Sequence, residues 1–178
     1  CRCGDADGRI VAPLSSTMTH CRIILVALAL TLLAHAAHAD DPVLPDPRVT
    51  PGAVATEDPT LVCQRGYARA MRHTSGRLKR QIYREYGINP RRGHYEVDHL
   101  VSLELGGADV AANLWPQSFD TEPWNAHVKD QLENFLHAEV CAGRMPLRQA
   151  QAEIAQDWIG TYRKYLGEPV QEGRAPGD

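Results

Sequence analysis

Apolar positions recur at helical spacing in the stretch that follows Ser75. Leu78, Ile82 and Tyr86 fall on one face of a predicted helix over residues 75–86. Ser75 is a residue type that caps helix N-termini, and the glycine after Tyr86 is a common stop signal. This part of the chain therefore predicts one short amphipathic helix.

The next stretch has a different pattern. Residues 95–105 are rich in β-forming side chains, and Gly106 and Gly107 then interrupt the run. Residues 113–117 form a second, short apolar stretch. Two such runs separated by a glycine-containing loop predict an antiparallel hairpin.

Two further helical patterns follow the predicted hairpin. The first opens with Thr121-Glu122-Pro123, which resembles a helix start with proline in the first turn, and ends at Gly143. Its apolar positions are Val128, Leu132, Phe135, Leu136 and Val140. The second begins near Pro146, and its apolar positions are Leu147, Ile154, Trp158, Tyr162 and either Tyr165 or Leu166. The order helix, strand, loop, strand, helix, helix predicts a small α+β domain.

The N-terminal part of the 178-residue chain has the pattern of an export signal. An apolar run over residues 23–34 follows a basic start at Arg22 and closes with an A-x-A-like sequence at Ala39. A transmembrane helix is the alternative, but it needs roughly 20 apolar residues, more than this run has. We interpret residues 18–39 as a signal peptide and residues 1–17 as an upstream extension.

This interpretation defines the organisation of the remaining chain. Residues 40–59 are proline-rich and are predicted to be an extended leader to the domain. Residues 60–167 form the predicted domain, and residues 168–178 form a loose tail. Since this part has no second apolar run of spanning length, we expect a periplasmic or secreted protein without a membrane span.

Cysteine usage depends on the same interpretation. Cys1, Cys3 and Cys21 lie in the part that export would remove, and Cys63 and Cys141 remain. An even pair in an oxidising compartment predicts a disulfide between Cys63 and Cys141. Two buried free thiols are the alternative.

Charge is divided unevenly along the chain, although the net charge is only -3. Nine basic residues face a single acid, Glu85, between Gln64 and His94. This asymmetry predicts an anionic partner for the segment, with Arg77, Lys79, Arg80 and Arg84 of the first helix as phosphate-binding residues. The alternative is a solvated face whose charges pair with the acidic remainder of the chain.

The middle of the chain holds residue types suited to phosphodiester hydrolysis. His99 can act as a general base near pH 7, and Asp98 can offer an oxygen ligand to a divalent metal. Adjacent residues of a regular strand point to opposite sides, so the two can serve one site only at a bend or at the strand end. Asn113 begins the return strand, and His127 lies early in the next helix. The alternatives without function are a structural histidine and an asparagine that starts a turn.

The run from Val97 to Gly107, with Asp98-His99 and the glycine pair, followed by Asn113-Leu114, resembles the HNH endonuclease signature. In that family these residues build a β-hairpin followed by a metal-binding helix, the ββα-metal core. The stretches C-x-x-G-Y, N-L-W-P-Q and K-D-x-L-E also resemble secreted or periplasmic bacterial proteins that carry this signature. They begin here at Cys63, Asn113 and Lys129, and the resemblance covers about residues 60–167.

The resemblance implies a role for each matched residue. His99 would be the general base, Asn113 would orient the hairpin and His99, and Asp98 would bind a divalent metal, Mg²⁺ above Mn²⁺ or Zn²⁺. His127 best matches the second metal ligand of the family. It lies 14 residues after Asn113, a longer gap than in common HNH proteins, so a residue of the intervening stretch could take its place: Asp120, Glu122 or Asn125.

Two classes of function follow from this interpretation. The first is an exported, metal-dependent endonuclease that cleaves DNA or RNA with low sequence specificity. The second is a binding or structural module of the cell envelope that keeps the HNH scaffold with weak or no hydrolysis. Another metal-dependent hydrolase that uses the same residues is a third, weaker candidate.

Overall fold

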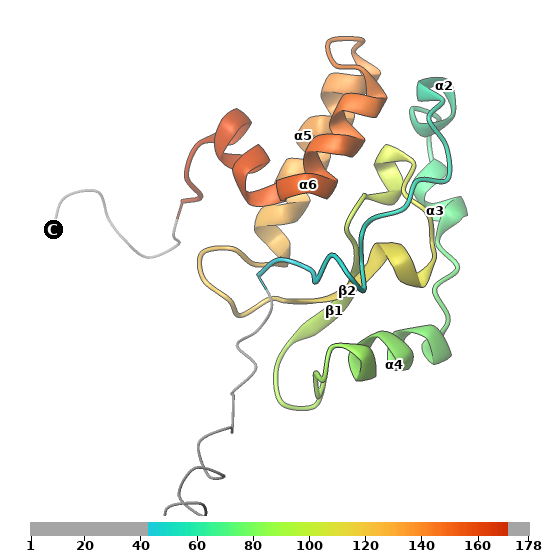
Figure 1. Ribbon diagram of the computed structural model, residues 1–178. Coiled ribbons are helices and arrows are strands. Elements are labelled where there is room, and N and C mark those ends of the chain that lie inside the picture. The colour runs from blue at the N-terminus through green and yellow to red at the C-terminus, as the bar shows by residue number, and fades with distance from the viewer. Residues whose placement is uncertain (1–42, 171–178) are drawn as a thin grey trace, which may run out of the picture. The chain divides into compact units, whose positions relative to one another are not determined.

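The computed structural model describes residues 43–170, which form an α+β unit around a two-stranded antiparallel sheet. Strand β1 (Tyr95–His99) pairs with β2 (Leu114–Ser118). Helix α4 (Gly76–Glu85) lies on one side of this hairpin, and α5 (Ala126–Cys141) with α6 (Leu147–Leu166) lies on the other (Figure 1). The predicted fold class is confirmed. The predicted signal peptide and upstream extension fall outside the described residues.

Helix α4 agrees with its prediction. The Ser75 hydroxyl accepts a hydrogen bond from the Leu78 N–H at 3.2 Å, and Gly87 takes a positive φ of 66° just past the helix. Ile82 is fully buried against Val97 and Leu114, so the apolar stripe of α4 covers one face of the hairpin.

Strand β1 is shorter than the sequence predicts. It ends at His99, and the apolar residues after it form a 3₁₀ turn, η1 (Leu103–Leu105), in place of further strand. The glycine pair explains this break: Gly106 has a φ of +76°, and a side chain on Gly107 would clash with the Val101 carbonyl oxygen. The chain therefore turns tightly back toward β2 through a second 3₁₀ turn, η2 (Ala111–Asn113).

The Asn113 side chain holds this return loop together. Its Oδ1 accepts hydrogen bonds from the Val101 N–H at 2.9 Å and the Ala53 N–H at 3.3 Å. Its Nδ2 donates to the Val101 and Ala108 carbonyls, both at 2.9 Å. The residue is fully buried, so all four bonds are made away from water.

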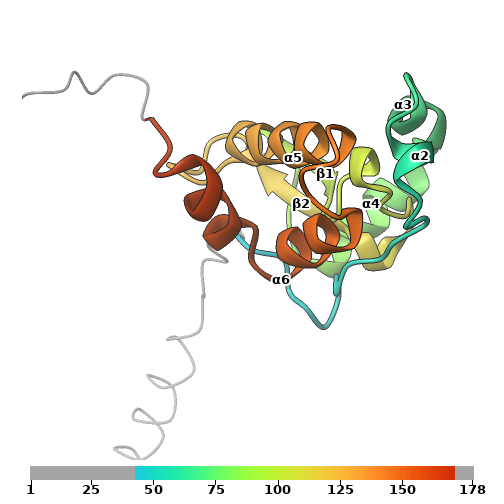
Figure 2. The same cartoon turned by 90° about the horizontal axis from the view of Figure 1, so that it is seen from above.

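Helices α5 and α6 lie next to each other, as Figure 2 shows from above, and their buried side chains supply most of the main core. The predicted apolar positions Leu132, Leu136, Ile154 and Trp158 are fully buried, and each such side chain contributes about 1.5–3 kcal/mol by leaving water. Helix α5 starts later than predicted, at Ala126, because the Asn125 Oδ1 caps it by accepting from the Val128 N–H at 3.1 Å. Pro123 therefore lies outside the helix.

The proline-rich stretch predicted as a leader belongs to the folded unit from Val43 onward. The buried Thr50 hydroxyl donates to the Leu114 carbonyl at 2.8 Å and accepts from the Tyr86 hydroxyl at 2.7 Å. The Trp158 indole N–H donates to the Val43 carbonyl at 3.2 Å. These long-range bonds tie an extended, non-periodic segment to the sheet and to α6, a result that local sequence patterns do not indicate.

Two short helices that the sequence analysis did not predict, α2 (Pro59–Val62) and α3 (Tyr67–Met71), precede α4. Cys63 follows α2 and is bonded to Cys141 at the end of α5, which confirms the predicted disulfide. The bond joins two parts of the chain 78 residues apart. Within residues 43–170, no helix has the length and apolar character needed to cross a membrane.

Replacement of Asn113 by alanine tests its role in the return loop. Asn113→Ala leaves the buried Val101 N–H and carbonyl and the half-buried Ala108 carbonyl without this partner, and each buried group left so costs about 1–3 kcal/mol. We expect the free energy of unfolding, measured by urea titration, to fall by about 3 kcal/mol. Asn134→Ala, which removes an exposed asparagine of α5, is the control and should change it by less than about 0.5 kcal/mol. Equal losses in the two variants would contradict the role.

Candidate active site on the hairpin and helix α5

The side chains of Asp98 and His99 point to opposite faces of β1, as the pleat of a regular strand requires. His99 Nε2 lies 2.9 Å from Asp109 Oδ1 in the loop between the strands. Asp98 Oδ2 lies 2.6 Å from the Nζ of Lys129 on α5. The predicted pair is therefore divided between two neighbouring clusters, and no bend brings the two side chains to one point.

Asp109 is fixed by three hydrogen bonds. It accepts from the His73 N–H at 2.6 Å, from the Thr74 hydroxyl and from His99. Although burial acts to raise the pKa of Asp109, these bonds hold it below its usual range. Asp109 is thus a carboxylate that orients the His99 ring.

His99 itself is in the form that a general base needs. Burial lowers its pKa from the ordinary 6.5, and the Asp109 hydrogen bond only partly offsets that effect, so the ring is neutral at pH 7. With Nε2 donating to Asp109, the basic nitrogen is Nδ1. The side chain is 2% exposed, so a substrate reaches it only if neighbouring residues move.

On the other face, the Lys129 ammonium joins α5 to the hairpin. It donates to Asp98 Oδ2, to the His99 carbonyl at 2.8 Å and to Glu133 one turn along α5. The Lys129 side chain is 1% exposed. Burial opposes its charge, but Asp98 and Glu133 hold its pKa above the usual range. The Lys129–Glu133 pair, which the sequence could equally assign to a helix surface, is a buried ion pair.

More carboxylates surround this ammonium than it can neutralise. Burial, with the charges of Asp98 and Asp130, raises the pKa of Glu96 to about 7. Burial and the charge of Asp98 also raise the pKa of Asp130. Raised carboxyl pKa values in one place indicate an excess of negative charge, and they are typical of functional sites.

The hairpin adds polar atoms without partners to the same face. Gln117 is paired with Glu96 across the strands, and Trp115 is paired with Asp98, so the four side chains share one side of the sheet. Gln117 is buried, and neither its amide oxygen nor its amide nitrogen has a hydrogen-bond partner in the structure. Oxygen donors and uncompensated negative charge are the chemistry that a hard divalent cation such as Mg²⁺ requires. The residues therefore suit such an ion on donor type and charge, although no three of their acidic side chains are gathered as a ready ligand group in the described part of the chain.

His127 is linked to this set through its charge, which acts to lower the pKa of Asp130. His127 is on the first turn of α5 and is exposed, and its ring contacts Phe119 with centroids 5.0 Å apart. Of the alternatives named for its role, Asp120 bonds His94 and Asn125 caps α5. Glu122 lines a separate cavity beside His127. The acids that interact electrostatically with Asp98 and were not predicted as ligands are Glu96, Asp130 and Glu133.

The basic residues predicted to bind phosphate are placed as the hypothesis requires. Arg77, Lys79, Arg80 and Arg84 are all exposed on α4. Within residues 43–170, the ion pairs include none of the nine bases between Gln64 and His94. Within the described residues, these charges are therefore solvent-exposed and form no close ion pair with the acidic part of the chain.

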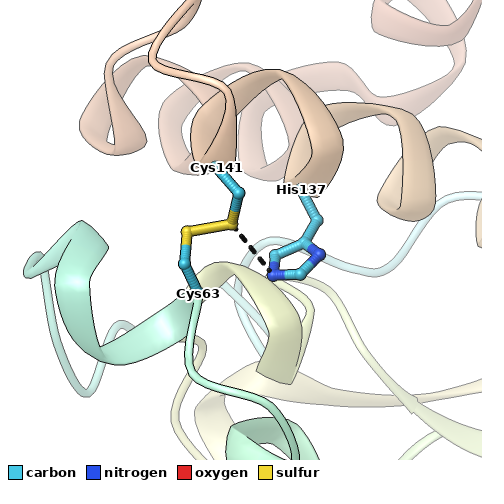
Figure 3. A group of neighbouring side chains, drawn as sticks. All are labelled: Cys63, His137 and Cys141. Atoms are coloured by element: carbon cyan, nitrogen blue, oxygen red, sulfur yellow. Dashed lines mark hydrogen bonds between the residues drawn. A yellow bond between two sulfur atoms is a disulfide. The ribbon is translucent and has the colours of Figure 1, made fainter.

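A second group of potential metal ligands lies at the disulfide. Cys63, His137 and Cys141 have ligand atoms within 4.8 Å of one another, the one group of three or more such residues found in the described part of the chain. Figure 3 shows the His137 ring beside the sulfur–sulfur bond, with Nε2 3.3 Å from Cys141 Sγ. Because both sulfurs are in the disulfide, neither is a thiolate ligand in this state.

No protein-family model, curated protein or solved structure matches the chain. Its site is therefore interpreted from its own residues and from the sequence resemblance.

Several residues of the two clusters were not predicted as site residues, among them Asp109, Glu96, Asp130, Glu133 and Lys129. Two of them had a signal in the sequence. Glu96 precedes Asp98 by two positions and so shares its face of any regular strand, and Lys129 lies four residues before Glu133. Asp109 had no such signal, because only the path of the loop brings it to His99.

Removal of the buried ammonium tests how much the fold depends on it. Lys129→Met leaves Asp98 and Glu133 without their cation, so we expect a loss of about 3–5 kcal/mol in the free energy of unfolding at pH 7. Lys164→Met is the matched control. Lys164 also pairs with a carboxylate, Glu153 at 2.8 Å, but is 54% exposed, and its loss should cost less than about 1 kcal/mol. Urea titration measures both, and similar small losses would contradict a stabilising role for Lys129.

The raised pKa of Glu96 predicts a pH-dependent stability. The folded state holds a proton on Glu96 up to pH about 7, whereas the unfolded chain releases it near 4.5. Stability is therefore lost as the pH rises from about 4.5 to about 7, because ionised Glu96 faces Asp98 and Asp130 with only Lys129 and Arg72 to offset them. Glu96→Gln should match the wild type at pH 4.5 and exceed it at pH 8, in unfolding measured with EDTA present. Parallel curves for the two proteins would contradict the assignment, and exposed Glu85→Gln serves as the control.

Proposed function

We propose that this protein is an exported, metal-dependent endonuclease of the HNH type that hydrolyses phosphodiester bonds of DNA or RNA. The observation that carries the proposal is the His99–Asp109 pair on a hairpin whose return loop is held by Asn113. A neutral, oriented imidazole is the group that such a hydrolysis needs to take a proton from water.

In this proposal each residue has one task. His99 Nδ1 accepts the proton of the attacking water, and Asp109 keeps the proton of the ring on Nε2 and stabilises the imidazolium that forms. Asn113 fixes the loop that carries Asp109 relative to β1. General-base catalysis of this kind contributes a factor of about 10²–10⁴ in rate.

The metal would be held by carboxylates of the cluster around Lys129. Asp98 and His127 remain the candidate ligands from the resemblance, and Glu96 and Asp130 are added because they lie in the charge environment of Asp98. When bound, a divalent ion supplies Lewis-acid stabilisation of charge on the scissile phosphate. Mg²⁺ suits an all-oxygen set, and Mn²⁺ and Zn²⁺ are the alternative occupants.

The exposed bases of α4, which form no ion pair within residues 43–170, support a nucleic-acid substrate. Lys and Arg side chains that contact phosphates bind without regard to sequence, which fits low specificity. Export is supported by the leader pattern of residues 18–39 and by the Cys63–Cys141 disulfide, a bond typical of oxidising compartments.

A second candidate function is favoured by one specific observation. The Lys129 ammonium already supplies a cation between the hairpin and α5, and His99 is 2% exposed. Both features suit an HNH scaffold that binds a ligand of the cell envelope without cleaving it.

Cleavage assays with two matched histidine variants separate these functions. The full chain, expressed with its own leader and recovered after export, is incubated with plasmid DNA or RNA and Mg²⁺, Mn²⁺, Zn²⁺ or EDTA. We expect metal-dependent cleavage, reduced by about 10²–10⁴ in His99→Ala. His94→Ala is the control, because His94 also pairs with an aspartate, Asp120, but at an exposed position, and it should cleave at the wild-type rate.

Each outcome of this assay decides between the two proposals. Cleavage that His99→Ala and EDTA both abolish supports the nuclease. A folded wild-type protein that cleaves neither nucleic acid with any of the metals overturns the nuclease and leaves the scaffold function. Equal loss in the His99 and His94 variants would contradict the role given to the buried pair.

A further inference from the structure

A cavity of about 510 Å³ lies beside the candidate active site and is lined by three arginines, Arg65, Arg69 and Arg72. Arg69 is on α3, and Arg65 and Arg72 lie just before and just after it, so that all three line the same cavity. All three are exposed, and none takes part in an ion pair of the described residues. Like charges that line one cavity repel each other, so the cluster favours an anionic ligand.

The cavity adjoins both clusters of the candidate site. The charge of Arg72 lowers the pKa values of both His99 and Glu96, so its guanidinium acts on the two faces of β1. The two residues after Arg72 are His73 and Thr74, which hold Asp109. One end of the arginine row therefore reaches the His99–Asp109 pair.

Helix α5 connects the cavity with the carboxylates. Asn134 and His137 line the cavity, and Asp130 precedes Asn134 by one turn on the same face of the helix. Glu104 also lines the cavity, and its charge contributes to the raised pKa of Asp130. A nucleic-acid strand lying along this face would pass from the carboxylate cluster into the arginine cavity without leaving the surface.

The cavity has the chemistry of a nucleotide subsite. Arginine binds phosphate oxygens through two parallel N–H donors, and Tyr67 adds an aromatic side chain to the lining. A positively charged groove with an aromatic side chain is the arrangement that holds single-stranded nucleic acid. The cysteine next to this row, Cys63, is bonded to α5, so the disulfide holds the two walls of the cavity together.

We propose that Arg65, Arg69 and Arg72 form the binding site for the nucleic-acid strand next to the scissile phosphate. This inference rests on the proposed nuclease function and refines it: the α3 row, and not the α4 bases Arg77, Lys79, Arg80 and Arg84, binds the strand next to the reacting bond. Helix α4 covers the face of the hairpin on which His99 lies, whereas the arginine cavity includes residues of α5, the helix on the face of the Asp98 carboxylate (Figure 1).

Binding measured without cleavage tests the inference separately from catalysis. All proteins carry His99→Ala, and binding of fluorescein-labelled 12-nucleotide single strands of DNA and of RNA is followed by anisotropy in EDTA, at several salt concentrations. We expect Arg65→Gln with Arg69→Gln to weaken binding about tenfold. The slope of log affinity against log salt should become shallower by about 0.7 for each phosphate that the protein no longer neutralises.

Two further double variants serve as comparisons. Arg91→Gln with Arg92→Gln removes the same charge before the first residue of β1, at the end of the strand away from His99, and should leave the salt slope unchanged. Arg77→Gln with Arg80→Gln removes two bases of α4 and should reduce affinity less than the cavity variant does. The urea midpoints of all variants should agree, because each of these arginine side chains is exposed.

The outcomes separate this inference from the proposed function. If the α4 variant loses more affinity than the cavity variant, or if the three variants lose the same affinity, the inference is overturned and the nuclease proposal stands. If the wild-type chain binds neither strand, the inference is also overturned. If binding depends on the cavity but the His99-containing protein cleaves nothing, the nuclease proposal fails and the binding site remains.

Discussion

The position of α5 against the hairpin depends on the hydrogen bonds that the Lys129 ammonium makes. This ammonium joins α5 to the hairpin through Asp98 and the His99 carbonyl, and it holds Glu133 in the same buried network. A buried charge is tolerated only when such partners surround it. The position of α5 over the carboxylate face of β1 is therefore fixed by electrostatics as well as by apolar packing, and this same face carries the raised pKa of Glu96.

The two faces of β1 have different surroundings. His99 and Val97 face the α4 side, where burial keeps the imidazole neutral and Asp109 orients it. Glu96 and Asp98 face α5, where carboxylates outnumber cations. Strand β1 therefore separates the basic nitrogen of His99 from the carboxylates of Glu96 and Asp98. Nucleic-acid hydrolysis would need both, and Arg72 lies close enough to influence each side.

The disulfide and the N-terminal segment connect distant parts of the fold to its centre. Cys63 ties the α2–α3 region to the end of α5, and Thr50 with Val43 ties the proline-rich segment to β2 and α6. A two-stranded sheet alone is marginal in water. Helices on both faces and these cross-links compensate for the small sheet.

The sequence by itself determined the elements whose signals are local. Periodicity and capping predicted α4 and the apolar faces of α5 and α6, and cysteine parity predicted the Cys63–Cys141 bond. Tertiary structure decided where the elements begin and end and which side chains meet, because these features depend on contacts between residues far apart in the sequence. Asn125 and not Pro123 begins α5, the glycine pair ends β1 at His99, and Asp109 meets His99 only through the path of the loop. The Asp98–His99 motif lies on the regular strand β1, and the alternation of side chains along that strand directs the two residues to different partners.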